Sequence, residues 1–201
     1  MIDPTELDQE PLLDDGADDG EDDWSDEVPA GLDSELLDAV DVTTERLGGR
    51  QTFIGATIYV PCSAEKVWQV LTDYDHLADF IPNLQESRCI ASPSPDCVRL
   101  EQVGAERFLK LKFCARVVLD MVEQFPYRID FSMVEGDFKS FVGHWAIAPL
   151  DAPDPGVQLS YGVIVLPTRL MPIRLIERHL RKNLVINLAA IRQRAVEIAA
   201  S

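Results

Sequence analysis

The sequence predicts one α+β domain, in which a curved antiparallel sheet of about seven strands grips a long C-terminal helix. Short runs of alternating apolar and polar residues, separated by turn residues, fill residues 40–166. Runs joined by such short turns are expected to pair as antiparallel neighbours. Residues 172–200 follow with apolar residues at spacings of three and four. That spacing is typical of a helix that covers the apolar face of a sheet.

The first predicted elements are a β-hairpin and two short helices. Residues 40–45 alternate, Gly48-Gly49 forms a turn, and residues 53–60 are rich in β-branched and aromatic residues, which together predict the hairpin. A helix is expected over 64–71 and a second one over 75–81, where Pro82 ends it. A helical turn over 34–38 precedes the hairpin.

The remaining elements are strands and the closing helix. Strands are predicted over the runs 84–91, 97–103, 109–124, 128–134, 138–148 and 157–166. Pro172 suits the first turn of the helix, which extends for roughly 27 residues, or about 40 Å. Its apolar stripe consists of Ile173, Ile176, Leu180, Leu184, Leu188, Ile191, Ala195 and Ile198.

Negative charge is concentrated at the start of the chain. The 201 residues include 35 acidic and 18 basic ones, for a net charge of −17. Of the acids, 18 lie between Met1 and Glu45, where there is no Lys or Arg, so the rest carries about +1. Because such charge density opposes collapse, we expect residues 1–38 to be an acidic disordered leader and residues 39–201 to be the folded domain. Phosphate would repel the leader, so no nucleic-acid partner is expected.

No signal peptide, membrane span or metal site is predicted. The first residues lack a basic region with an apolar run, and no stretch reaches the roughly 18 uninterrupted apolar residues that span a bilayer. The four cysteines form no CxxC or CxxH pair, so no zinc site is expected. No cofactor and no other metal is expected either. We therefore expect a cytoplasmic protein, and peripheral contact with a membrane is left open.

Four segments carry a resemblance to a known superfamily. They are residues 64–74 (AEKVWQVLTDY), 77–84 (LADFIPNL), 134–139 (VEGDFK) with Gly143 and Trp145, and 187–192 (NLAAIR). In their order along the chain they resemble the START-like, or polyketide cyclase/dehydrase (SRPBCC), superfamily over residues 40–200. The likeness is greatest to the cyanobacterial and plastid branch related to coenzyme Q-binding proteins. It implies the helix-grip fold of START and birch-pollen-allergen-like proteins.

The resemblance implies binding of a hydrophobic small molecule and leaves the reaction open. The superfamily includes lipid carriers, plant-hormone binders, quinone-binding proteins and polyketide aromatase/cyclases. We expect binding or carriage of a quinone, isoprenoid or related lipid in a cavity between the sheet and the helix. The alternatives are an aromatase/cyclase acting on a poly-ketone, and a protein-interaction module that uses the acidic leader. No cyclase motif can be placed, so no catalytic residue is assigned. A binding protein is therefore favoured over an enzyme.

Strand parity predicts which side chains face this cavity. Three polar residues share the inward faces: Tyr161, Gln102 and Asn187. Either they orient a carbonyl or hydroxyl of the ligand, or they satisfy backbone groups and each other. The expected apolar contacts are Trp145, Phe113, Phe131, Val117, Met133 and Leu184.

Histidines and a basic cluster lie outside this set. His144 is out of phase with Trp145 and should face away from the cavity, while His76 and His179 are expected in exposed helical positions. Basic residues crowd the first half of the closing helix, and they either contact anionic lipid headgroups, dock the acidic leader or form a solvated face. These residues are Arg174, Arg178, Arg181 and Lys182, with Arg169 just before them.

Overall fold

A computed structural model describes residues 29, 31–108, 111–151 and 155–200, with backbone alone for 105–108 and 111–113. Its strands form one antiparallel sheet in the order β1-β2-β8-β7-β6-β5-β4-β3. The α+β helix-grip prediction is confirmed, with eight strands in place of about seven. The strands are β1 (Asp41–Gly48), β2 (Gln51–Val60), β3 (Leu84–Ile90), β4 (Val98–Phe108), β5 (Leu111–Gln124), β6 (Arg128–Gly136), β7 (Ser140–Leu150) and β8 (Gly156–Leu166).

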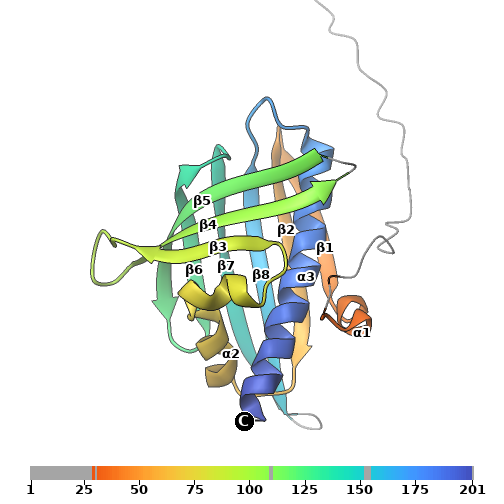
Figure 1. Ribbon diagram of the computed structural model, residues 1–201, viewed down its shortest axis with the longest axis vertical. Coiled ribbons are helices and arrows are strands. Elements are labelled where there is room, and N and C mark those ends of the chain that lie inside the picture. Colours follow the sequence, from red (N-terminus) through yellow and green to blue (C-terminus); the bar gives the residue numbers. More distant parts are fainter. Residues whose placement is uncertain (1–28, 30, 109–110, 152–154, 201) are drawn as a thin grey trace, which may run out of the picture.

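The helices gather on one side of the sheet. α3 (Ile173–Ala199) follows β8 and runs along the sheet face, while α2 (Ala64–Leu71) and the 3-10 helix η1 (Tyr74–Asp79) cover the end near the C-terminus (Figure 1). The second predicted helix is thus a 3-10 helix. It is short because Pro82 follows at once and offers no backbone N–H to extend it.

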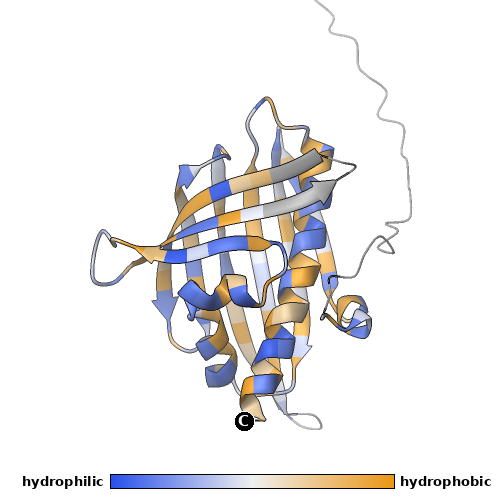
Figure 2. Ribbon diagram, in the orientation of Figure 1, coloured by the Kyte–Doolittle hydropathy of each residue, from blue (hydrophilic) through white to orange (hydrophobic). Residues whose placement is uncertain are grey.

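The core is densest where α2 meets the sheet and α3. Ile58, Leu159 and Leu188 are at most 2% exposed, and Val67 of α2 is fully buried. Apolar and polar residues alternate along the strands and along α3 (Figure 2), as amphipathic elements around one core require.

α3 is covered on more sides than its apolar stripe predicts. Val185, Ile186 and Ala189 lie off the stripe and are buried nonetheless. His179 is 5% exposed, so its expected exposure was wrong. A single stripe marks the face toward the sheet, but it does not show that other segments pack against the remaining faces.

The end of the expected leader packs on α3. Leu32 lies against the core, Gln193 Nε2 donates to the carbonyl of Gly31 at 3.2 Å, and α1 (Ser34–Asp38) follows with Asp33 as its N-cap. Residues 1–28 and 30 lie outside the described residues. The boundary at residue 38 and the disorder of the leader therefore stay predictions.

Candidate functional site

Half-buried apolar side chains of four strands and of α3 pack against the buried core. We call this group the inner patch. Its members pack against the core yet retain accessible surface, unlike Ile54 or Leu159 of the neighbouring strands. The inner patch consists of Val117, Met133, Phe141, Trp145, Tyr161 and Leu180.

Aromatic rings from three strands meet in the inner patch. Tyr161 of β8 stacks on Phe131 of β6, with ring centroids 5.4 Å apart, and meets Trp145 of β7 edge to face at 4.5 Å. Phe131 also stacks on Phe141 at 5.8 Å. Cross-strand pairing of Trp145 with Tyr161 sets this geometry, since paired residues on one sheet face lie within contact distance.

Two of the three predicted polar contacts carry a group without a protein partner among the described residues. Neither the hydroxyl of Tyr161 nor the buried Oδ1 of Asn187 on α3 forms a hydrogen bond there. Burial alone raises the pKa of the Tyr161 phenol, so the hydroxyl stays neutral and can both donate and accept. An unpaired buried polar group costs free energy, and Asn187 Oδ1 is such a group. Contact of Tyr161 and Asn187 with a ligand stays a prediction.

Gln102 behaves differently from the other two predicted polar residues. Its Nε2 donates to Ser87 Oγ at 3.3 Å, and Ser87 in turn donates to the carbonyl of Tyr74 at 2.6 Å. Its amide thus already has a protein partner, which is the alternative that the sequence left open. Whether Gln102 also reaches a ligand stays a prediction.

The apolar residues predicted for the site divide into three groups. Val117, Met133 and Trp145 belong to the inner patch, whereas Phe131 and Leu184 are only 3% and 4% exposed and pack within the core. The side chain of Phe113 lies outside the described residues. Phe141 shares strand parity with Trp145, and Leu180 lies on the helix stripe, so both were expected to face inward, but neither was among the predicted ligand contacts.

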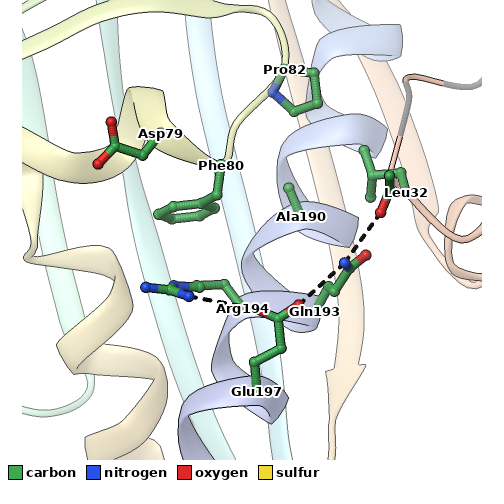
Figure 3. A pocket seen from close by; sticks show the side chains of 9 residues that line it. Leu32, Asp79, Phe80, Pro82, Ala190, Gln193, Arg194 and Glu197 are labelled. Atoms are coloured by element: carbon green, nitrogen blue, oxygen red, sulfur yellow. Dashed lines mark hydrogen bonds and ion pairs between the residues drawn. The ribbon is translucent and has the colours of Figure 1, made fainter.

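A separate groove of about 240 Å³ opens between η1 and α3 (Figure 3). Charged Asp79, Arg194 and Glu197 line it together with Phe80, and the Arg194 guanidinium lies 6.0 Å from the Phe80 ring. Arg194 also pairs with Glu197 at 3.5 Å. None of the predicted ligand contacts lines this groove. Its volume is below the usual range for ligand sites, and its charges do not suit a hydrophobic molecule.

The histidine and basic residues lie outside the inner patch. His144 neighbours Trp145 on β7 and therefore faces the other side of the sheet; burial, and then Arg128, lower its pKa. Arg174 and Arg178 are exposed on the first half of α3, while Arg181 and Lys182 are half-buried. Within the described ranges, no helix has the length and apolarity to cross a bilayer.

Solved structures with the same fold belong to proteins of different activities. One is the Zhui aromatase/cyclase from Streptomyces sp. R1128, with 17% identity, a TM-score of 0.63, and coverage of 72% of this chain and 93% of that one. Another is a STAR-related lipid transfer protein from Xanthomonas axonopodis, with 13% identity, a TM-score of 0.64, and coverage of 78% and 93%. A START superfamily protein from Mycobacterium smegmatis has 17% identity, a TM-score of 0.59, and coverage of 73% and 98%. These likenesses establish the fold.

The family itself follows from the sequence match. No curated protein matches the chain, and the narrower likeness to coenzyme Q-binding proteins stays a prediction. The profile described as "Polyketide cyclase / dehydrase and lipid transport" matches residues 60–189, which include α2, η1, strands β3 to β8 and most of α3. The chain therefore belongs to the polyketide cyclase / dehydrase and lipid transport family, within the START-like superfamily that the sequence predicted.

Proposed function

We propose that the protein binds and carries a hydrophobic small molecule at the inner patch, between the sheet and α3, and that this molecule is a quinone, an isoprenoid or a related lipid. The environment of Tyr161 is the observation that carries the proposal. Burial raises the pKa of its phenol, yet the residue retains accessible surface and its hydroxyl has no partner among the described residues. A half-buried aromatic side chain in an apolar patch, with an unpaired hydroxyl, suits contact with a bound molecule.

The chemistry of the patch favours an apolar ligand with one polar end. Aromatic side chains pack on the Tyr161 ring, and its hydroxyl can donate to a carbonyl or accept from a hydroxyl. Asn187 lies at a similar level of the fold. Val165 and Ile176 pack together, and Tyr161 lies four strand residues, or about 13 Å, from Val165. The same distance along α3 corresponds to about nine residues beyond Ile176, close to Asn187.

Carriage is favoured over the two other functions considered. An aromatase/cyclase needs an acid or base beside its substrate, and the polar side chains assigned to this site, Tyr161, Asn187 and Gln102, are all neutral. A protein-interaction module that uses the acidic leader would not need the inner patch. Removal of residues 1–37 would then abolish partner binding and leave ligand content unchanged.

Native mass spectrometry of the gently purified full chain tests the proposal. We expect a bound apolar molecule that organic solvent extracts. Val117→Trp should displace it, because the larger side chain fills the patch from β5. Val122→Trp is the matched control on the same strand, since Val122 is 47% exposed on the other face.

The proposal fails if the wild-type chain carries no ligand and also binds neither an added short-chain quinone nor a fluorescent fatty acid. It fails as well if Val117→Trp binds these probes as tightly as Val122→Trp does. Near-ultraviolet circular dichroism of both variants verifies that the domain is folded.

A further inference from the structure

The loop that joins β8 to α3, residues 167–172, presents an apolar side chain to solvent. Leu170 is 95% exposed, the highest value among the large apolar residues of the described chain. A single exposed leucine is common on protein surfaces. Its meaning here depends on how the loop is held and on what surrounds it.

Arg50 fixes this loop from the neighbouring β1–β2 turn. One guanidinium nitrogen, Nη2, donates to the carbonyl of Thr168 at 2.9 Å and also to that of Met171. The backbone N–H of Met171 closes a turn onto Thr168 at 3.1 Å, and its side chain packs beside Phe138 and Ile176. Leu170 therefore projects from a turn whose flanking residues are anchored, which lowers the entropy lost when the side chain binds something.

A second exposed leucine lies at the same end of the domain. Leu47 is the last residue but one of β1, just before the β1–β2 turn, and is 44% exposed. That turn and the β8–α3 loop lie side by side at the end of the molecule remote from the C-terminus (Figure 1), as the Arg50 hydrogen bonds also require. Two exposed leucines thus lie at one end of the domain.

Positive charge surrounds these leucines. Arg46, Arg169, Arg174 and Arg178 are exposed there. Acids lie at this end as well, among them Asp137 next to Phe138. Glu45 is exposed, and Glu177 accepts from Thr52 Oγ1 at 2.6 Å and pairs with Arg46 at 3.4 Å. Exposed arginines thus lie beside the exposed leucines at this end of the described chain.

We propose that this end, formed by Leu47, Leu170, Arg46, Arg169, Arg174 and Arg178, docks on a lipid bilayer with anionic headgroups. Cationic side chains beside protruding apolar ones match a surface that carries negative headgroups above hydrocarbon. The leucines enter the interface, and the arginines bind phosphate and carboxylate groups with their planar guanidinium forks. The docking does not require a ligand in the inner patch, so it can be tested separately from the proposed function.

Vesicle co-sedimentation of the full chain tests the docking. Vesicles of phosphatidylcholine alone are compared with vesicles that contain about 30% phosphatidylserine, at about 0.1 M salt where surface charges still interact. We expect binding to the anionic vesicles only. Leu170→Ser should weaken it about tenfold, and Arg169→Gln and Arg174→Gln about fivefold each.

Leu150 supplies the matched control. It is 40% exposed and pairs with Gly156 at the start of β8, whereas the loop follows Leu166 at the other end of that strand. Leu150→Ser should leave vesicle binding unchanged. The fluorescence of Leu170→Trp should shift to shorter wavelength on anionic vesicles, and that of Leu150→Trp should not.

The proposal is overturned if the wild-type chain leaves both vesicle types unbound, or if it binds neutral and anionic vesicles equally. An equal loss of binding in Leu150→Ser and Leu170→Ser also overturns it. Because Leu170 is almost fully exposed, its substitution should leave the Tm unchanged, and a Tm measurement excludes misfolding as the cause of any loss.

Discussion

The indole of Trp145 meets the ring of Tyr161 edge to face, with centroids 4.5 Å apart. This contact, together with the stack on Phe131, holds the phenol in place while its hydroxyl lacks a partner among the described residues. Packing of the ring and hydrogen bonding of the hydroxyl are therefore separable by substitution.

We predict that Tyr161→Phe leaves the free energy of unfolding in urea unchanged or slightly higher, because no protein hydrogen bond is lost. Ligands that end in a carbonyl or hydroxyl should bind about fivefold more weakly, equivalent to about 1 kcal/mol for one hydrogen bond. A purely hydrocarbon analogue should bind as before. Tyr59→Phe, at a 36% exposed residue, is the control and should change neither affinity. A clear loss of stability in Tyr161→Phe would contradict this account of the site.

Gly143 of β7 supports the same aromatic rings. A Cβ at this position would lie 2.1 Å from the Gly162 carbonyl oxygen and 2.6 Å from Cζ of Phe131. A ring can shift, but a backbone carbonyl within the sheet cannot. We predict that Gly143→Ala lowers the free energy of unfolding by about 2–3 kcal/mol, the range for overpacked interiors.

Gly104 of β4 is the matched control for that substitution. Its Cβ would meet no heavy atom nearer than 3.7 Å, so Gly104→Ala should change stability by less than about 0.5 kcal/mol. Urea unfolding of both variants decides the matter. Equal effects at the two glycines would show that loss of chain flexibility, and not the close approach at Gly143, determines the outcome.

Local patterns in the sequence predicted most of the fold. The two-residue period identified the strands, and the three-and-four spacing identified α3, because each pattern records which side of one element is buried. Parity also brought Trp145 and Tyr161 to one face. The sequence of either strand alone did not predict that these two residues pair, because the pairing depends on the register between β7 and β8.

The sequence did not predict the contacts between distant segments. Gln102 finds its partner Ser87 through the β3–β4 register, and Arg50 binds carbonyls more than a hundred residues away. Neither residue differs in type from an exposed polar one, so no local signal marks its role. The burial of His179 was missed for the same reason.

Glu101 of β4 predicts how stability depends on acid. Its carboxylate is 10% exposed and accepts from Arg116 Nε at 2.6 Å, with Arg88 on its other oxygen. The hydrogen bond from Arg116 and the charge of Arg88 lower its pKa below 4.5. A lowered pKa in the folded state means that the carboxylate stabilises the fold above pH 4.5, and that this contribution is lost as the pH falls through the folded-state pKa.

We therefore predict that Glu101→Gln is less stable than the wild type at pH 7, and that the difference shrinks toward pH 3. Urea unfolding at pH 7, 5 and 3 measures it. Glu86→Gln makes the same chemical change at an exposed position of β3 and should show a much smaller difference at every pH. A Glu101→Gln deficit that stays constant from pH 7 to pH 3 would rule out this ionic contribution.

The charge of the leader predicts how it affects membrane docking. Residues 1–28 contain 13 acids and no bases, so they account for most of the net charge of −17 and leave −4 for the rest. Anionic headgroups repel this segment, whereas they attract the arginines around Leu170.

We predict that replacing the 13 acids by Asn and Gln in the full chain raises the affinity for phosphatidylserine-containing vesicles several-fold at about 0.05 M salt. The gain should largely disappear at about 0.5 M salt, where the Debye length is only a few ångströms, and should be absent on neutral vesicles. Co-sedimentation across this salt range measures it. Weaker binding after neutralisation would instead mean that the leader itself contributes to membrane attachment.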